Sequence, residues 1–413
     1  MMKILLSAFA CEPGQGSEEG VGWNAVVEAA KHQEVWVLTR TFYRAAIEAE
    51  LAVLPNNPNL HFVYLEPFGW SENFKGRQGG VQLHYYLWQI LAYFQARSLH
   101  RQVNFDIARH VTYVKFWSPS FISLLPIPFI WGPVGGGEAA PKPFWEDFSL
   151  KAKLYETARY WAQRLGESDP FARMTAQRSV LALATTEDTA KRVRAMGAKN
   201  VQVLSETCLS KAEFARLAQC EMPAASPIRF ISMGRLLHWK GYHLAVRAFA
   251  VANLPNAEYW LLGEGPERDR LESLAQELGI ASQVKFWGRL PREESLGKLG
   301  ESHVLIHPSL HDSGGWTCLE GMAAGRPIVC LDLGGPATQV TDETGIKVPG
   351  YRPKQAVQGL AEAIARLAGD PELRSRMGAS GKKLVTEVYD WDVKGEFFAK
   401  LCEDIVARYK DNT

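Results

Sequence analysis

The sequence predicts two α/β domains of the doubly wound class, each built on a parallel sheet, and three observations support this. A chain of 413 residues is longer than one typical domain. Short, almost continuously apolar segments alternate with helical segments along both halves, which is the pattern of parallel strands covered on both faces. A Pro-rich break at residues 223–227 divides the halves. We therefore expect an N-terminal domain at 1–220 and a C-terminal domain at 228–386.

The expected elements follow in order along the chain. In the first half the predicted strands are residues 3–9, 35–39, 60–65, 107–112, 128–131 and 180–184, with a helix at 21–30. In the second half they are residues 228–233, 258–262, 284–287, 304–307 and 328–331, with helices at 242–252, 268–278 and 317–324. Ligands of such sheets bind beyond the carboxyl ends of the strands. We therefore expect the two domains to face each other across a cleft that contains the reactive groups.

Composition excludes several classes of protein. The net charge is +1 and neither half has a strong basic excess, which disfavours a nucleic-acid-binding protein. No apolar run approaches the roughly 18 residues of a membrane span, and residues 1–10 fit a buried first strand better than a signal peptide. The six cysteines are scattered without a C-x-x-C pair, as expected of reduced thiols in a cytoplasmic protein.

Two glycine-rich loops follow strands of the first half. The first runs from Gly14 to Gly20 and contains Gly16, but its spacing is one residue longer than the dinucleotide fingerprint and three glutamates lie nearby. A tight strand-to-helix turn explains it equally well, so a dinucleotide-binding or non-enzymatic protein ranks last. In the second loop, at 132–138, three successive glycines favour backbone facing the cleft, which makes Gly136, Gly137 and Glu138 candidates on the acceptor side.

The loop after the strand at 228–233 carries two cations. Arg235 and Lys240 lie five residues apart at the carboxyl end of a strand and just before a helix. Such a pair, beside the N-terminus of a helix, can bind a diphosphate. The alternative is two solvated surface cations.

The segment at 308–327 carries acidic residues and paired glycines at the start of a helix. Backbone N–H groups at Gly314 and Gly315 can meet phosphate or sugar hydroxyls, and Glu320, on the exposed side of the helix, can hold a vicinal diol. In the alternative interpretation Asp312 caps the helix and Glu320 is an ordinary surface charge.

Taken together, these motifs resemble family 4 of the retaining glycosyltransferases, the glycosyl transferases group 1, which have the GT-B fold. The resemblance is carried by strand–G-R-L-x-x-x-K-G–helix, L-G-E-G-P at 262–266, V-K-F-W-G at 284–288 and H-D-S-G-G-x-x-x-L-E-G-M-A-A-G-R-P from 311. It is close over residues 228–350. The segment Y-D-W at 389–391 is similar to the family's signature before its last helix, which implies that residues 387–413 cross back onto the N-terminal domain.

The resemblance implies roles for individual residues. Arg235 and Lys240 would hold the donor diphosphate, Glu320 the nucleotide ribose, and Asp312 would lie near the donor sugar. Asp312 stands where the family has a longer glutamate, so its direct contact with the sugar stays open. The remaining donor-binding candidates are Gly16, Gly288, Arg289, Leu290, Ser313, Gly314, Gly315, Trp316 and Thr317.

Three further features have two interpretations each. His110 ends a predicted strand, where the resemblance implies a catalytic histidine in the cleft, and the alternative is a core histidine. The D-x-D at 390–392 is a pattern that can bind a metal, but we assign it to the signature of the last helix. Residues 81–101 form an amphipathic helix whose stripe of Leu83, Leu87, Ile90, Leu91 and Phe94 we expect to be buried; an acceptor-binding or membrane-contacting surface is the alternative.

The resemblance as a whole implies a metal-independent retaining transferase, with a hexose as the expected sugar. A nucleotide-diphospho-sugar with UDP or GDP would be the co-substrate, without a further cofactor. The acceptor would be a carbohydrate, a lipid-linked saccharide or a small molecule, with peripheral membrane contact at the inner face as an open alternative. Another GT-B enzyme, such as a nucleotide-sugar epimerase or a phosphorylase, is the competing interpretation. The sugar, the acceptor, the linkage and the oligomeric state stay open.

Overall fold

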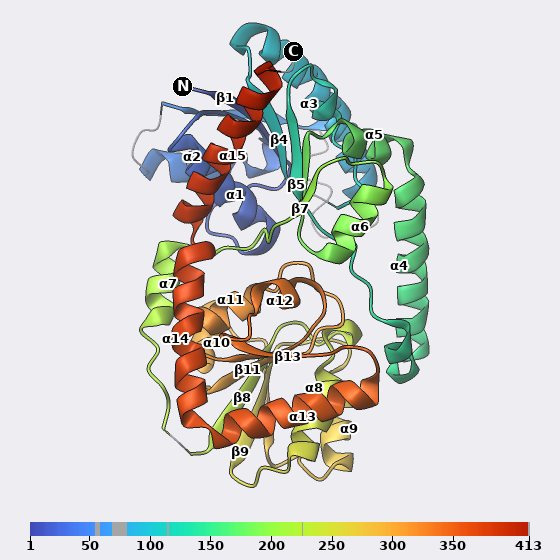
Figure 1. Ribbon diagram of the computed structural model, residues 1–413, viewed down its shortest axis with the longest axis vertical. Coiled ribbons are helices and arrows are strands. Elements are labelled where there is room, and N and C mark those ends of the chain that lie inside the picture. The colour runs from blue at the N-terminus through green and yellow to red at the C-terminus, as the bar shows by residue number, and fades with distance from the viewer. Residues whose placement is uncertain (54–57, 68–80, 114, 225, 412–413) are drawn as a thin grey trace. The chain divides into compact units, whose positions relative to one another are not determined.

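The computed structural model describes residues 1–53, 58–67, 81–113, 115–224 and 226–411, and the chain divides into two units (Figure 1). The first unit comprises Met1–Gly137, Trp161–Glu206 and Trp391–Thr413. The second unit comprises Glu138–Tyr160 and Thr207–Asp390. Each unit contains its own parallel sheet and its own core.

The first unit is built on a parallel sheet, ordered β3-β2-β1-β4-β5-β6-β7 within the described residues. Its strands are β1 Lys3–Ala8, β2 Glu34–Arg40, β3 Leu60–Leu65, β4 Ile107–Thr112, β5 Phe129–Val134, β6 Leu181–Ala184 and β7 Val201–Val203. The chain order reverses between β1 and β4, which makes the crevice between their carboxyl ends the position where such sheets bind ligands.

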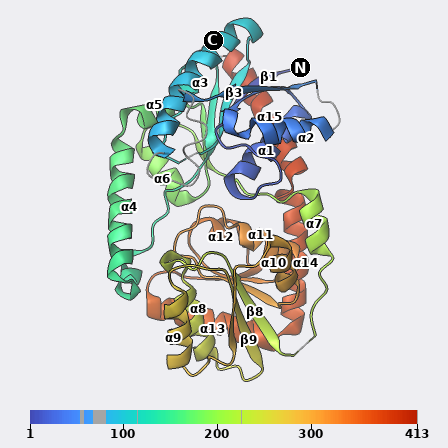
Figure 2. The ribbon, with the colours of Figure 1, turned by 180° about the vertical axis from the view of Figure 1, so that it is seen from behind.

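Helices cover both faces of this sheet, as Figures 1 and 2 show from opposite sides. The helices α1 and α15 pack against each other on one face, and α3 and α5 pack against β1, β3 and β5 on the other. The helical elements are α1 Ser17–Ala30, η1 Thr41–Tyr43, α2 Arg44–Val53, α3 Val81–Val103, η3 Phe121–Leu124, α5 Pro170–Arg178, α6 Glu187–Ala195 and α15 Trp391–Asp411. The helix α4, Leu150–Ser168, begins in the second unit and ends in the first.

The second unit has a parallel sheet of order β10-β9-β8-β11-β12-β13 within the described residues. Its strands are β8 Ile228–Met233, β9 Ala257–Leu262, β10 Val284–Gly288, β11 Val304–His307, β12 Ile328–Leu331 and β13 Gly345–Val348. Here the order reverses between β8 and β11. These are the two strands that precede the predicted donor-binding loops.

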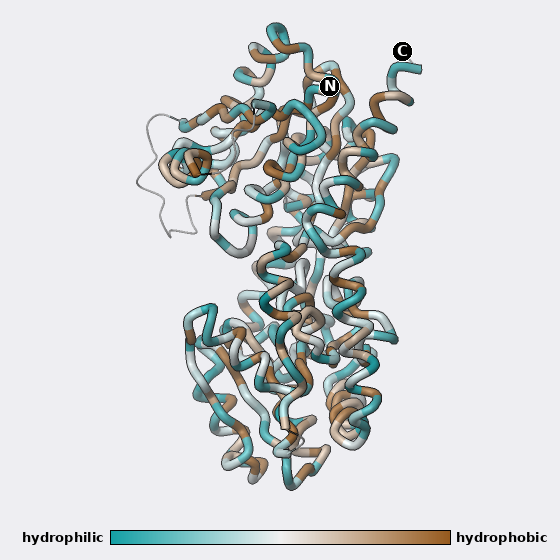
Figure 3. Tube along the Cα trace, turned by 90° about the vertical axis from the view of Figure 1, so that its left-hand side faces the viewer, coloured by the Kyte–Doolittle hydropathy of each residue, from teal (hydrophilic) through white to brown (hydrophobic). Residues whose placement is uncertain are grey.

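Two apolar clusters, one on each face, hold the second unit together. One contains α8 and α13 and the other contains α11 and the end of α14. The helical elements are η4 Lys142–Asp147, α7 Lys211–Ala218, η5 His238–Lys240, α8 Tyr242–Ala252, α9 Arg268–Glu277, α10 Arg292–Gly300, α11 Trp316–Ala323, α12 Gly334–Gln339, α13 Pro353–Gly369 and α14 Pro371–Val388. Figure 3 shows hydrophobic and hydrophilic residues alternating along the helices, as expected of elements with one buried face.

The predicted fold class, two doubly wound parallel-sheet α/β units, is confirmed. The predicted strands agree closely with the observed ones because buried parallel strands read as continuous apolar runs. Two short strands at sheet edges, β7 and β13, were not predicted.

The structure places the domain boundaries differently from the prediction. Residues 138–160 belong to the second unit because Phe144, Phe148 and Ala152 are buried in the cluster that contains α8 and α13. Residues 207–220 also belong there, since Leu217 of α7 is buried in the cluster that contains α11. The Pro-rich break therefore lies inside the second unit, between α7 and β8. The last helix, α15, belongs to the first unit and starts at Trp391 instead of 387.

The orientation predicted for α3 is wrong. Tyr85 and Trp88 are fully buried in the core of the first unit, whereas Leu83 is 62% exposed and Phe94 is 61% exposed. The helix buries its aromatic face because Tyr85 and Trp88 make edge-to-face contacts with Phe9 at the end of the first strand. The aliphatic stripe is left at the surface.

Candidate active site

The loops that follow β8 and β11 are in direct contact at the point where the strand order reverses. Gly241, with φ +68°, ends the first loop, and a Cβ there would lie 2.0 Å from the carbonyl oxygen of Pro308 in the second. The amide of Leu310 donates to the carbonyl of Trp239 at 2.8 Å. Only glycine permits this approach, so the two predicted donor-binding loops form one surface.

At the centre of this surface is a charged cluster. The Lys240 ammonium donates to Asp312 Oδ2 at 2.5 Å, and His307 Nε2 at the end of β11 lies 3.1 Å from the same oxygen. The side chains of Lys240 and Asp312 are each about one fifth exposed. The structure therefore brings two predicted catalytic residues together.

The electrostatics of the cluster favour a charged Asp312. Burial alone would raise the pKa of this carboxyl, but Lys240 and His307 outweigh it and hold the pKa well below its usual range. Burial lowers the pKa of His307, so the ring serves as a neutral hydrogen-bond donor. The cluster is thus a carboxylate that orients an ammonium, with two N–H groups of Lys240 left to meet an anion.

Glu320 lies on α11, one turn inside the helix, and is buried rather than exposed. Its Oε1 accepts from Arg292 at 2.7 Å, and Arg292 also donates to Glu213 at 2.9 Å. Burial raises the pKa of Glu320 and Arg292 opposes this. Both the expectation of an exposed carboxylate and the alternative of an ordinary surface charge are therefore corrected, because the helix turns this side chain toward α10.

The loop between Asp312 and Glu320 is held by contacts within the second unit. Ser313 Oγ donates to Glu138 Oε2 at 2.6 Å, and the carbonyl of Gly314 accepts from Thr207 Oγ1 at 3.1 Å. Gly315, with φ +58°, is the N-cap of α11, and Trp316 and Thr317 form its first turn. The amide of Cys318 donates to the carbonyl of Gly315 at 2.8 Å, and the first amides of any helix have no partner within the helix itself.

The other residues predicted on the donor side differ in their exposure. Arg235 is exposed, directly after β8, and no ion pair of its guanidinium occurs among the described residues. Gly288 is buried with φ +69°, Arg289 is exposed and Leu290 is half-buried. The carbonyl of Gly288 accepts from the amide of Gly263 at 2.8 Å. The motifs L-G-E-G-P at 262–266 and V-K-F-W-G at 284–288 are therefore in contact.

His110 is a fully buried residue of β4, and the structure corrects the expectation that it faces a cleft. Its Nδ1 lies 3.0 Å from Ser7 Oγ and 3.1 Å from Ser120 Oγ, and its Nε2 lies 3.0 Å from Tyr85 Oη. Burial lowers its pKa to about 3. Both nitrogens are occupied, which is the arrangement of a satisfied core histidine.

The first glycine-rich loop is exposed at residues 14–16 and packed at Gly20, where a Cβ would lie 2.2 Å from the carbonyl oxygen of Gln15. Gly16 is exposed at the N-cap of α1, and a Cβ there would meet nothing within 4 Å. Gly22, inside α1, also requires glycine, because a Cβ would come 2.0 Å from the carbonyl of Ala10. Glu18 and Glu19 already occupy the first turn of α1, where they complement the helix dipole.

The second glycine-rich loop is also packed, contrary to the expectation of backbone facing the cleft. A Cβ on Gly136 would lie 3.1 Å from the Trp117 ring, and one on Gly137 would lie 2.5 Å from Thr189 Cα. The carbonyl of Gly136 accepts from Gln163 at 2.7 Å. Gly137 is buried and Gly136 is half-buried, and both belong to the first unit, whereas Glu138 belongs to the second unit and accepts from Ser313.

A buried carboxylate that the sequence did not indicate lies beside the same loops. Glu156 of α4 accepts from His238 at 2.8 Å and from His311 at 3.2 Å. The two histidines flank predicted site residues, so they could have been noticed. Glu156 could not, because it is 82 residues away from the nearer of them.

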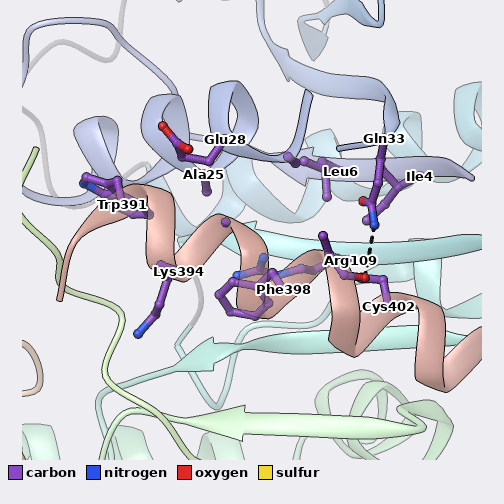
Figure 4. A pocket seen from close by; sticks show the side chains of 13 residues that line it. Ile4, Leu6, Ala25, Glu28, Gln33, Arg109, Trp391, Lys394, Phe398 and Cys402 are labelled. Carbon is purple, nitrogen blue, oxygen red and sulfur yellow. Dashed lines mark hydrogen bonds between the residues drawn. The ribbon is translucent and has the colours of Figure 1, made fainter. Parts of the chain in front are cut away.

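A small cavity in the first unit contains none of the predicted site residues. It lies between α1, β1, β4 and α15, and Figure 4 shows Arg109 beside Phe398 within it. The Arg109 guanidinium lies 3.4 Å from the centre of the Phe398 ring and donates to the carbonyl of Gly132. The cavity has a volume of about 20 Å³, which is enough for one water molecule and too small for a nucleotide. It reflects how α15 packs on the unit.

The D-x-D segment at the start of α15 is engaged with that helix's neighbour. Asp392 accepts from Lys31 at 2.7 Å, and Lys31 also bonds Glu28. Within the described part of the chain, no group of three or more His, Cys, Asp or Glu side chains is placed to hold a metal ion. No described helix is long and apolar enough to cross a bilayer.

Comparison with solved structures confirms the GT-B fold class. The chain is similar to sucrose-phosphate synthase from Thermosynechococcus elongatus, with a TM-score of 0.67 and 18% identity over 99% of this chain and 100% of that one. It is also similar to Anabaena HepE in complex with UDP and glucose, with a TM-score of 0.59 and 17% identity over 98% of this chain and 100% of that one.

Sequence comparison finds similarity to one family over part of the chain. Residues 222–384 match the model of the glycosyl transferases group 1. The lipopolysaccharide core biosynthesis glycosyltransferase LpsD of Rhizobium meliloti is 33% identical over 215 residues, which cover 49% of this chain and 60% of that protein. A GDP-mannose-dependent monoacylated α-(1-6)-phosphatidylinositol monomannoside mannosyltransferase of Corynebacterium glutamicum is 30% identical over 178 residues, 41% of this chain and 45% of that one.

The matched segment begins just before β8 and includes both charged loops, so the similarity to the glycosyl transferases group 1 lies in the second unit. The alignments span less than two thirds of the curated relatives.

Proposed function

We propose that this protein is a metal-independent, retaining glycosyltransferase of family 4 that moves a hexose from a UDP- or GDP-sugar to a hydroxyl acceptor. The observation that carries the proposal is the ion pair of Lys240 with Asp312 beside the N-terminus of α11, at the reversal of strand order in the sheet. An ammonium close to the start of a helix suits a diphosphate. Glu320, a buried carboxylate of the same helix, suits a ribose diol.

In the proposed reaction the protein stabilises the leaving group. The bond between the anomeric carbon and the diphosphate oxygen breaks, and negative charge develops on the diphosphate. Lys240, Arg235 and the first amides of α11 neutralise it, which is the contribution a metal would otherwise make. The acceptor hydroxyl attacks the anomeric carbon from the same face, and its proton passes to a phosphate oxygen of the donor. Asp312 holds the Lys240 ammonium toward that phosphate.

The substrates are proposed from chemistry and from relatives. The backbone at 288–290 would read the nucleobase, and both UDP and GDP remain candidates, since HepE was solved with UDP and a mannosyltransferase relative is GDP-mannose-dependent. The relative LpsD acts in lipopolysaccharide core biosynthesis, which favours a saccharide or lipid-linked saccharide as the acceptor. A cytoplasmic location suits all of these.

A nucleotide-sugar epimerase or a phosphorylase remains the alternative. An epimerase would convert its nucleotide-sugar without any acceptor, and a glycogen-type phosphorylase would carry pyridoxal phosphate and show its absorbance. The assay described next detects the first outcome, and an absorbance spectrum of the purified protein detects the second.

The direct test is a donor screen followed by turnover. Binding of the correct donor should raise the melting temperature, by an amount that grows with its concentration above the dissociation constant. The best donor is then incubated with saccharide acceptors in EDTA, and we expect sugar transfer with release of the nucleoside diphosphate. Complete dependence on added Mg²⁺ or Mn²⁺ would contradict the metal-independent mechanism, and conversion of the donor without an acceptor would favour the epimerase.

We further propose that the first unit binds an anionic lipid surface peripherally. The helices α3 and α5 and the end of α4 are neighbours (Figures 1 and 2), and a hydrogen bond of 2.6 Å from Tyr86 to Asp169 joins α3 to the start of α5. Large apolar side chains are exposed on these elements. This apolar surface consists of Leu83, Ile90, Leu91, Phe94, Trp161, Leu165 and Phe171. Among these residues, Leu165 has the largest exposed fraction, 72%.

Charge indicates the kind of partner. The helix α3 contains no acidic residue and its exposed stripe continues into Arg97 and Arg101. The acids of the adjoining elements are engaged, since Glu167 bonds Arg192 and Asp169 caps α5. An apolar stripe bordered by cations is typical of helices that lie at an anionic bilayer surface.

Sedimentation with vesicles tests this. The protein should bind vesicles of phosphatidylglycerol and phosphatidylcholine, less at high salt, and should not bind phosphatidylcholine alone. The double variant Leu83→Ser, Phe94→Ser should lose binding, whereas Val53→Ser, an exposed apolar residue of α2, should keep it. Equal binding by the double variant and the wild type would overturn this proposal.

A further inference from the structure

The N-terminal half of α4 packs against both charged loops of the second unit. Glu156 is only 2% exposed, and its Oε1 is bonded by His238 of the loop after β8 and by His311 of the loop after β11. These are separate loops, 73 residues apart in the chain by residue number, and one carboxylate oxygen joins them.

An aromatic stack reinforces the same junction. The Trp239 ring lies between two others, with its centre 5.1 Å from that of Tyr155 at an angle of 10°, and 5.3 Å from that of His311 at 16°. Tyr155 belongs to α4 and the other two rings belong to the two loops. Two adjacent residues of α4 therefore contact the two loops. Tyr155 does so through its ring, and Glu156 does so through its carboxylate.

The joined residues are direct neighbours of the proposed catalytic pair. His238 precedes Lys240 by two residues in the short helix η5, and His311 precedes Asp312. We propose that Glu156 is a positioning residue that holds these two loops in register, so that Lys240 and Asp312 meet the donor diphosphate in their paired geometry. This inference rests on the proposed function.

The chemistry of the contact requires a carboxylate. Glu156 accepts two N–H bonds through one oxygen. Burial raises its pKa, but the bonds from His238 and His311 outweigh burial and lower the pKa to about 2, so the side chain stays charged at neutral pH. A glutamine of the same shape would keep one carbonyl oxygen and lose the charge that strengthens both bonds.

A positioning role predicts a particular kinetic signature. Misplacing a catalytic group by about 1 Å can cost on the order of 10²-fold in rate. We therefore expect Glu156→Gln to lower kcat by about 10- to 100-fold. The KM for the donor should change by less than about threefold, because nucleoside binding at Glu320 lies on another helix. Glu156→Asp, which keeps the charge on a shorter stem, should recover part of the loss.

The matched control is Glu167→Gln, a carboxylate on the same helix that bonds Arg192 of the first unit, and it should leave kcat unchanged. His311→Gln, and the double variant that combines it with Glu156→Gln, complete a double-mutant cycle. If the two residues act through the same contact, the kcat of the double variant should be hardly lower than that of either single variant.

Failure of this inference can be distinguished from failure of the proposed function. If Glu156→Gln is folded and turns over at the wild-type rate, or if KM rises while kcat stays constant, the inference is overturned and the proposed function stands. If the wild type transfers sugar from no nucleotide-sugar, both fall together.

Discussion

Lys240 is the residue whose removal separates catalysis from folding most clearly. Its ammonium pairs with Asp312, its side chain is about one fifth exposed, and it ends the short helix η5. We expect Lys240→Ala to lower kcat by about 10²- to 10³-fold, as loss of one contact to a developing anion does. The melting temperature should also fall, because the Asp312 carboxylate loses the ammonium that stabilises it, but the variant should still fold. Lys383→Ala, an exposed lysine of α14, is the control and should be neutral. A folded Lys240→Ala protein with wild-type kcat would remove Lys240 from the site.

Glu320 tests how the nucleotide is held. If both ribose hydroxyls bond its carboxylate, the wild type should bind UDP or GDP more tightly than the 2′-deoxy nucleotide. Glu320→Gln should bind more weakly and lose most of that discrimination, because the charge that strengthens both bonds is gone. Calorimetric titration of both proteins with both nucleotides measures this. Equal discrimination in the two proteins would refute the assignment of the ribose to Glu320.

Asp312 should make stability depend on pH in a defined direction. Its pKa in the folded protein lies below that of an unfolded aspartate, about 3.9, because Lys240 and His307 stabilise the carboxylate. It therefore contributes stability above that pH, which is lost as the pH falls. Asp312→Asn should be less stable than wild type at pH 7, and the gap in unfolding free energy should narrow between pH 5 and 3. Urea denaturation at several pH values measures it, and a constant gap would contradict the account.

At the scale of elements, the segment 138–160 decides how the donor loops are supported. Phe144 is fully buried in the cluster of α8 and α13. Phe144→Ala should cost about 3–5 kcal/mol of unfolding free energy, the range for a buried phenylalanine. Leu150→Ala, at the exposed start of α4, should stay within about 0.5 kcal/mol. Denaturant titration compares them, and an equal loss in both would mean that the segment does not belong to this core.

Elements also show what sequence patterns can predict. The strands were predictable because burial on both faces leaves continuous apolar runs, and the charged loops because their residues are close in the chain. The orientation of α3 was not, since its aliphatic and aromatic residues are both apolar. Contacts with residues distant in the chain, such as Phe9, decide which of them are buried. The packing of Gly137 depends on Thr189, far along the chain, and so gave no local signal.

At the scale of the whole molecule, contacts between distant segments define the units. The boundary was expected at a Pro-rich break, but it follows Glu206, because Leu217 is buried in the second unit. His110 shows the same limit, since its partners Ser7, Tyr85 and Ser120 come from three elements. A motif places a residue near a strand end, whereas only packing shows whether it is accessible.

The central claim is that this protein transfers a sugar from a nucleotide-diphospho-sugar with retention and without a metal. The most direct measurement is proton NMR of the product formed from the best donor in the screen, in EDTA, with the coupling constant of the anomeric proton reporting configuration. We predict that an α-linked donor gives an α-linked product and free nucleoside diphosphate at equal rates. A β-linked product, or no product until a divalent metal is added, would contradict the claim.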